Sequence, residues 1–177
     1  MTDQEQLRYP IGRFSASNPL IPAARAAQIE ILRDLPYALR GAVAGLNDAQ
    51  LDTPYRDGGW TVRQLVHHVA DSHGNALFRC KLALTEDWPT IKPYDEAAWA
   101  ELADSRTLPI ETSLELIAAL HERWVTLLES LSGADFEKGY NHPESGRQNL
   151  ATVLASYSWH SLHHTAHITA LRTRQGW

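Results

Sequence analysis

The stretch NLATVLASYSWHSLHHTAHITALRT, residues 149–173, decides the fold, because its apolar residues recur with a helical period and four of its residues are histidines. One row of this helix holds residues that are seven apart, namely Leu150, Tyr157, His164 and Leu171. His164 therefore faces the expected core, and His160 lies one turn earlier at the edge of the same row. The pattern predicts a long helix that begins near Asn149 and ends near Thr173.

Three further segments have helical periodicity, whereas alternating strand patterns are almost absent. The first runs from Pro22 to about Val43, and Pro36 inside it predicts a kink or a break because proline has no backbone N–H. The second begins after Thr61, which forms a capping-box pattern with Gln64, and ends near Leu84.

The third helix is expected to follow Thr112, which forms a second capping-box pattern with Glu115, and to carry Leu116 and later apolar residues inward. Four long amphipathic helices predict an all-α four-helix bundle. The connection over residues 86–112 is long, with a short helical piece near 95–102, and it allows helices that are not consecutive to become neighbours. A small hairpin is expected after Gly133.

We expect one domain over residues 1–177, with residues 1–18 as an extended N-terminal arm. The 16 Lys and Arg residues are scattered and the net charge is −5, so nucleic acid is not an expected partner. No apolar run reaches the roughly 20 residues that cross a bilayer, and no secretory signal is visible. A single cysteine, Cys80, is typical of a reducing compartment. The sequence therefore predicts a soluble cytoplasmic protein.

The histidine spacing points to a metal site. His160 and His164 are four residues apart on one helical face, where two ring nitrogens can bind the same ion. His163 and His167 have the same spacing but lie off the inward row, so we expect them to face solvent or to lie behind the ligands. A third ligand is expected from the second helix, where periodicity does not choose between His67 and His68.

Other polar side chains have weaker signals. Asp71 lies one turn from both His67 and His68 and could accept a hydrogen bond from either ring. His73 lies on the apolar row of its helix and is expected to be packed and hydrogen-bonded. Arg79 is a candidate contact for an anionic substrate, whereas His121 and His142 carry no signal that assigns them a role.

The segment LDTPYRDGGWTVRQ, residues 51–64, and the following His67-His68-x-x-Asp71-Ser72-His73 resemble the YfiT branch of the DinB superfamily. The resemblance extends from the Tyr-Pro-Ile-Gly of residues 9–12 to the terminal Gly-Trp. It implies a four-helix bundle, a homodimer, and a divalent metal held by one histidine of the second helix and an H-x-x-x-H pair of the last. On these motifs the metal ligands are His68, His160 and His164.

Three neutral imidazoles without a thiolate suit Zn²⁺, or Ni²⁺, at one ion per chain, and they leave a coordination position open for water or substrate. The first hypothesis is therefore a metal-dependent hydrolase of a small molecule, in which metal-bound water acts as the nucleophile. The second is a transferase that uses the metal to activate a low-molecular-weight thiol, as the resemblance to thiol transferases of the superfamily implies. The third is a stress-associated metal-binding bundle without catalytic activity.

Overall fold

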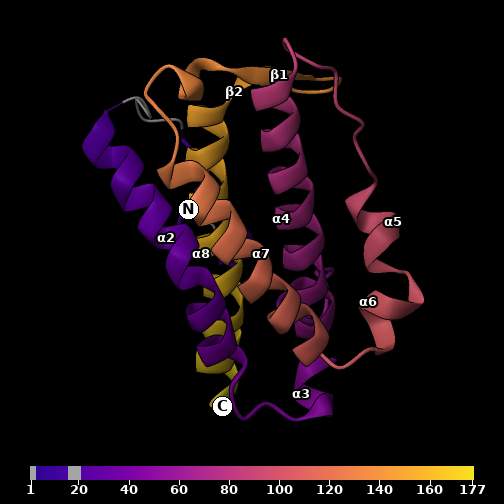
Figure 1. Cartoon of the computed structure of the whole chain (residues 1–177). Coiled ribbons are helices and arrows are strands. Elements are labelled where there is room, and N and C mark those ends of the chain that lie inside the picture. The colour runs from indigo at the N-terminus through magenta and orange to yellow at the C-terminus, as the bar shows by residue number, and fades with distance from the viewer. Residues whose placement is uncertain (1–2, 16–20) are drawn as a thin grey trace.

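The computed structural model describes residues 3–15 and 21–177. Its four long helices are α2 (Pro22–Val43), α4 (Val62–Thr85), α7 (Glu111–Glu129) and α8 (Leu150–Gln175). They pack as a four-helix bundle (Figure 1), which confirms the predicted fold class.

Shorter elements connect or cover these helices, namely α1 (Asp3–Arg8), α3 (Asp48–Leu51), α5 (Glu96–Ala100), α6 (Ala103–Thr107), the 3-10 helix η1 (Asp135–Glu137), β1 (Gly139–His142) and β2 (Gly146–Asn149). The two strands pair antiparallel, as predicted for a hairpin after Gly133. The N-terminal arm is not extended throughout, because residues 3–8 are helical, and residues 16–18 of the predicted arm lie outside the described residues.

The order of the helices around the bundle differs from their order in the chain. Helix α2 packs against α7 and α8, and α4 packs against the same two helices. Figure 1 shows that α4 and α7 run in the same direction, because the connection with α5 and α6 returns along the outside of the bundle. Consequently α4 and α8, which carry most of the histidines, are antiparallel neighbours.

The start of α4 is fixed by a capping box. Thr61 Oγ1 accepts a hydrogen bond from the backbone N–H of Gln64 at 3.2 Å, and Gln64 Oε1 accepts one from the backbone N–H of Thr61 at 3.0 Å. Two of the otherwise unpaired N–H groups of the first turn are thereby satisfied. The predicted start is confirmed, and it sets the rotation of the helix that carries His68.

The start of α7 differs from the prediction. The helix begins at Glu111 after Ile110, and no side chain caps it, so the box expected from Thr112 and Glu115 is not formed. Ile110 is buried at 4% exposure, and its burial in the core places the helix start ahead of the polar pair. Leu116, expected to face inward, is 52% exposed.

Pro36 does not break α2, which continues from Pro22 to Val43. Five apolar residues on its inner face remain buried along its length, namely Ile29, Leu32, Leu35, Leu39 and Val43. The expected break is therefore wrong, because burial of this face holds the helix together on both sides of the proline, whereas the kink stays a prediction.

The apolar core consists of two clusters separated along the bundle axis. Leu77, Trp124 and Leu154 belong to one cluster, and Val66, Ile117 and Ile168 belong to the other. On α4 and α8, the residues between the two clusters include buried histidines, and on α7 the buried His121 lies next to Leu120 of the first cluster. A polar layer therefore crosses the middle of the bundle.

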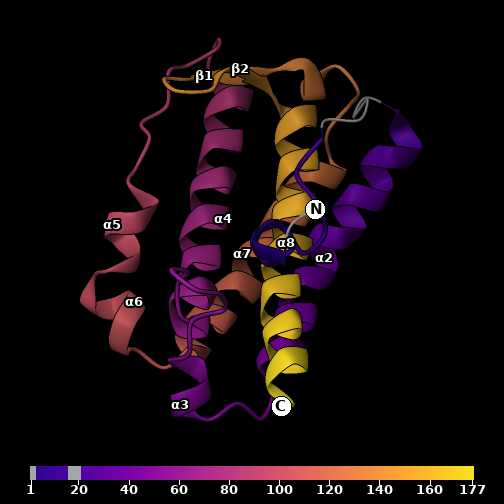
Figure 2. The same cartoon turned by 180° about the vertical axis from the view of Figure 1, so that it is seen from behind.

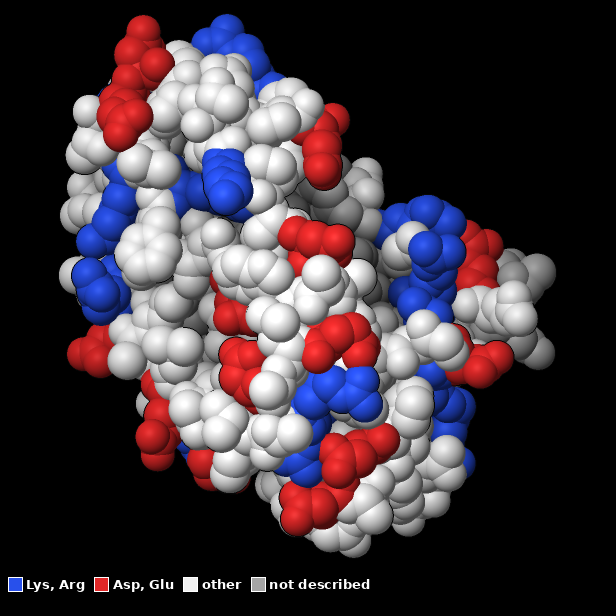
Figure 3. Space-filling view, turned by 90° about the vertical axis from the view of Figure 1, so that its right-hand side faces the viewer, with Lys and Arg blue, Asp and Glu red and all other residues white. Residues whose placement is uncertain are grey.

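No helix within the described ranges 3–15 and 21–177 is long and apolar enough to cross a membrane. On the face shown in Figure 3, basic and acidic side chains are interspersed, and neither sign forms a continuous stripe. This distribution agrees with the scattered charges of the sequence.

We expect Thr61→Ala to reduce the free energy of unfolding by about 0.5–2 kcal/mol, because the variant loses the side-chain acceptor of the N-cap. Urea denaturation followed by circular dichroism measures the change. Thr61→Ser is the matched control, since serine keeps the acceptor. Equal stability of the alanine variant and the wild type would contradict a stabilising role for this cap.

Candidate metal centre

Three imidazoles converge in the polar layer, one from α4 and two from α8. One donor atom of each of His68, His160 and His164 lies within 4.8 Å of the others. Nε2 of His160 is 3.4 Å from Nε2 of His68 and 3.0 Å from Nε2 of His164. The two α8 rings meet because residues four apart lie on one helical face. The structure thus brings together the three histidines that the resemblance implies.

The spacing of these nitrogens suits a metal ion. Ligand nitrogens placed tetrahedrally about 2.0–2.1 Å from Zn²⁺ lie roughly 3.3–3.4 Å from one another. Burial lowers the pKa of the His68 ring to about 4 and holds the pKa values of His160 and His164 well below 6.5. Neutral imidazoles are the form that binds metals. The donor set and its spacing therefore match a divalent cation.

His67, the competing residue on α4, points elsewhere. Its Nδ1 lies 2.7 Å from Ser113 Oγ, and its Nε2 lies 3.2 Å from the backbone oxygen of Leu108. Both ring nitrogens are thus engaged at α7 and at the segment that precedes it. The rotation of α4 separates His67 from the converging nitrogens, a choice that periodicity alone left open.

Asp71 does not reach the histidines. It is half-buried, and no hydrogen bond joins its carboxylate to His67 or His68 within the described part of the chain. Burial and, to a smaller extent, the charge of Asp104 raise the pKa of this carboxyl group to about 6. The expectation that Asp71 orients a ligand is therefore not met by the geometry.

His163 and His167 are buried, at 8% and 3% exposure, so the first alternative, that they face solvent, is wrong, and the second, that they lie behind the ligands, stays a prediction. Their Nε2 atoms lie 3.0 Å apart, and the ring of Trp159 stacks on His163 with centroids 4.3 Å apart. Figure 2 shows the N-terminal arm lying across α8, and Trp159 Nε1 donates to the backbone oxygen of Gly12 at 3.2 Å. The arm covers a helical face that the periodicity of α8 alone leaves exposed.

Two further histidines lie behind the converging rings. His73 is buried and hydrogen-bonded, as predicted, with His121 on one side at 2.9 Å and His160 on the other at 3.0 Å. His121, which the sequence left without a role, is 2% exposed. Its spacing from Ile117 and Trp124 on the buried face of α7 is the signal that could have identified it.

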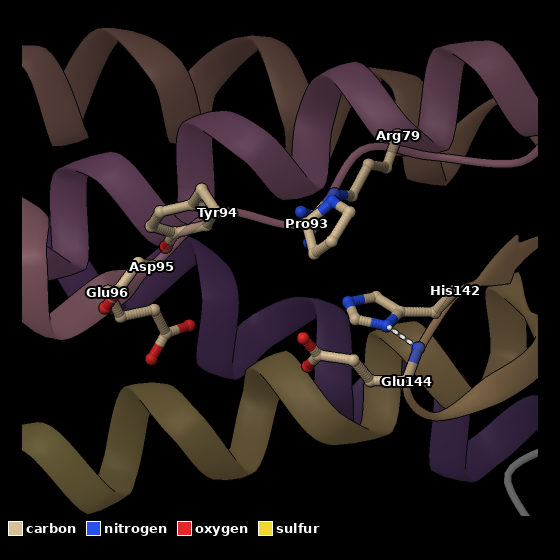
Figure 4. A pocket seen from close by; sticks show the side chains of 7 residues that line it. All are labelled: Arg79, Pro93, Tyr94, Asp95, Glu96, His142 and Glu144. Atoms are coloured by element: carbon tan, nitrogen blue, oxygen red, sulfur yellow. Dashed lines mark hydrogen bonds between the residues drawn. The ribbon is translucent and has the colours of Figure 1, made fainter.

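A pocket of about 600 Å³ lies beside the bundle between α4, the start of α5 and the β hairpin (Figure 4). Its lining residues are Arg79, Pro93, Tyr94, Asp95, Glu96, His142 and Glu144. Arg79 is 9% exposed and donates one hydrogen bond, to the backbone oxygen of Lys92 at 3.1 Å. The guanidinium group therefore keeps further N–H donors for a ligand, opposite the carboxylates of Glu96 and Glu144.

Aromatic side chains connect this pocket to the converging histidines. Burial raises the pKa of the Tyr94 hydroxyl, and the proximity of Glu96, Tyr157 and Asp71 raises it further. The Tyr157 hydroxyl donates to the backbone oxygen of Ser72 at 3.3 Å, and its ring centroid lies 5.5 Å from that of His160. Tyr94 thus lines the pocket, and Tyr157 lies against the ring of His160.

Comparisons with known proteins agree with this architecture. A model of the DinB superfamily matches residues 31–168. A "Putative metal-dependent hydrolase" of Bacillus cereus strain G9842 is 55% identical over 171 residues, which cover 97% of this chain and 98% of the relative. A protein of the same name from Bacillus mycoides strain KBAB4 is 54% identical over 173 residues, which cover 98% of this chain and 99% of the relative.

The solved structure of YfiT from Bacillus subtilis superimposes with a TM-score of 0.94 and 48% identity, over 97% of this chain and 99% of that one. It is described as a probable metal-dependent hydrolase with an unusual four-helix bundle topology. The helix order found here, with α2 packed against α7 and α8, is consistent with that description of the fold.

We expect the metal-free protein to lose stability as the pH falls from about 7 to about 5. Burial lowers the pKa of His167 to about 3 from 6.5, so in this window the unfolded state binds more protons than the folded state. Each such histidine changes the free energy of unfolding by up to about 1.4 kcal/mol per pH unit below its unfolded pKa. Urea denaturation at several pH values measures the slope.

His167→Phe isolates one contribution, because phenylalanine keeps a buried ring and removes the titration. The stability of this variant should fall less steeply with decreasing pH than that of the wild type. Equal slopes for the two proteins would show that His167 does not resist protonation in the folded state.

Proposed function

Because the chain belongs to the DinB superfamily, we propose that it is an enzyme that hydrolyses a small molecule with one divalent metal ion held by His68, His160 and His164. The single observation that carries this proposal is the convergence of the three neutral ring nitrogens within 4.8 Å. The relatives named as metal-dependent hydrolases support the reaction class.

Zn²⁺ is the ion that we favour, with Ni²⁺ as the alternative, because both accept imidazole ligands at neutral pH. Bound to three neutral imidazoles, such an ion lowers the pKa of water from ~15.7 toward about 7 and so supplies a nucleophile at neutral pH. The chain's own contribution is to hold the three rings neutral by burial and to keep them close together.

We propose that the pocket beside α4 binds the substrate. Arg79 would bind an anionic group, because its buried guanidinium keeps unused donors there. Tyr94 lines this pocket, and its ring would exclude water from the apolar part of a ligand. The remaining polar residues, Glu96 and Glu144, favour a ligand that also carries a positive group.

The charge pattern of the pocket also favours the second candidate function, transfer of a low-molecular-weight thiol. Such thiols commonly carry both ammonium and carboxylate groups, which match Glu96 and Arg79 respectively. The histidines would then hold a metal that stabilises the thiolate. Thiol-dependent consumption of monochlorobimane by the wild type, lost in His164→Ala, would favour transfer, whereas thiol-independent ester hydrolysis would favour the hydrolase.

The test of the metal site is elemental analysis of tag-free protein. We expect about one zinc or nickel per chain in the wild type and almost none in His68→Ala and His164→Ala, because two imidazoles hold an ion weakly. His67→Ala is the matched control, since it removes a neighbouring buried ring that points away from the site, and it should keep its metal.

Two outcomes would contradict the assignment. Metal retained in His68→Ala and lost in His67→Ala would place the third ligand at His67. No metal in the wild type after incubation with zinc would remove the metal-dependent reaction altogether. Stoichiometric metal without turnover of esters or thiols would favour the non-catalytic bundle.

We further propose that the protein acts in the cytoplasm as a homodimer. The free and buried Cys80 is consistent with a reducing compartment. Phe78 and Leu82 lie one turn apart on α4 and are 63% and 38% exposed, so they offer an apolar face for self-association. Light scattering of the wild type and of Phe78→Glu tests this face, and a monomeric wild type would contradict it.

A further inference from the structure

A row of three histidines leads from the backbone of α2 to the converging rings. Nδ1 of His121 lies 2.6 Å from the backbone oxygen of Leu32, and Nε2 of His121 lies 2.9 Å from Nδ1 of His73. Nε2 of His73 lies 3.0 Å from Nδ1 of His160. We call His121, His73 and His160 the histidine row. Its first two members are 2% and 0% exposed, so water does not replace these contacts.

The row begins at a carbonyl that Pro36 leaves without its usual partner. In an α-helix the oxygen of residue 32 accepts from the N–H of residue 36, but proline has no N–H, and its ring pushes that carbonyl aside. A buried carbonyl without a partner is costly. The His121 ring supplies the missing donor from α7, across the interface between α2 and α7.

The direction of the protons follows from this acceptor. A carbonyl oxygen only accepts, so Nδ1 of His121 carries a hydrogen and Nε2 of the neutral ring does not. Nδ1 of His73 must therefore donate to His121, which leaves Nε2 of His73 as an acceptor. His160 then donates from Nδ1 and carries a lone pair on Nε2, the atom that faces His68 and His164.

If the hydrogen bonds along the histidine row were donated in the opposite direction, the row would have to hold one additional proton. His121 would have to be cationic so that both of its nitrogens donate, and His160 would then carry its hydrogen on Nε2, which blocks metal binding through that atom. Burial disfavours this state, since it lowers the pKa of His121 to about 4. The carbonyl of Leu32 and the burial of the row thus select the same tautomer.

We propose that His121 and His73 are positioning residues that fix the tautomer and ring orientation of His160 for metal binding, with the Leu32 carbonyl freed by Pro36 as their anchor. This inference rests on the proposed function, because it assigns His160 as a ligand. Among the described residues, Nδ1 of His160 contacts His73, whereas Nδ1 of His164 is buried without a hydrogen-bond partner, so the row acts on His160 alone of the two α8 ligands.

The tautomers are testable in the metal-free wild type. Nitrogen-15 NMR of the histidine rings distinguishes protonated from unprotonated nitrogens. We expect a hydrogen on Nδ1 and none on Nε2 for His121, His73 and His160. A hydrogen on Nε2 of His160 in the metal-free protein at neutral pH would overturn the proposal. This measurement needs neither a variant nor a bound ion.

Metal affinity tests the consequence. Competition with a chromophoric chelator should show zinc binding weakened about 10- to 100-fold in His73→Phe, because a ligand loses its hydrogen-bonded support. His121→Phe should weaken binding in the same direction but by less, although His121 does not touch a ligand. His167→Phe is the matched control, since it also replaces a buried imidazole by a phenyl ring and leaves a histidine partner unpaired, and its affinity should equal that of the wild type.

The outcomes separate this inference from the proposed function. Zinc affinity in His121→Phe equal to that of the wild type would contradict a role for the row beyond His73. If His121→Phe and His167→Phe lost the same amount of zinc affinity, the loss would be explained by general loosening of the core, and the proposal would be contradicted. If the wild type bound no zinc, the proposed function would be wrong. The NMR assignment would still decide whether the carbonyl of Leu32 sets the tautomers of the row.

Discussion

A buried imidazole has two ring nitrogens whose burial is costly without a partner, and the pairing of these nitrogens organises the middle of the bundle. Seven histidines are buried among the described residues, and they lie between or beside the two apolar clusters. Most of their nitrogens pair with another ring, a serine or a backbone oxygen. On the tautomer proposed for His160, its Nε2 carries a lone pair toward His68 and His164, and a cation held by the three rings would bind a lone pair from each.

The order of the helices makes this layer possible. A bundle with consecutive helices as neighbours would separate at least one pair that the layer requires. Here the connection through α5 and α6 returns outside the bundle, so that α7 runs alongside α4 and α8 lies opposite in direction to α4. Three histidines from three helices can then contact one another in the core, namely His121 of α7, His73 of α4 and His160 of α8. The same connection supplies Tyr94 and Glu96 to the wall of the pocket.

Sequence patterns predicted what depends on one helix at a time. The spacing of His160 and His164, the cap at Thr61 and the four long helices are local properties, and the structure has them. Properties that depend on how two helices or segments pack together could not be predicted from the periodicity of one helix. Periodicity did not separate His68 from His67, because the choice depends on how α4 faces α8. It left open whether His163 and His167 face solvent or lie behind the ligands, because the covering arm lies far away in the chain. It left His121 without a role because its partners lie on α2 and α4.

Pro36 in α2 also couples the evolution of positions 36 and 121, which lie far apart in the chain. While residue 36 is proline, the carbonyl of Leu32 needs a donor from outside its helix, and His121 provides it. A relative with a different residue at position 36 regains the helical hydrogen bond, and selection for a histidine at position 121 is relaxed. Substitutions at the two positions should therefore accompany one another in evolution, although neither residue touches the proposed metal.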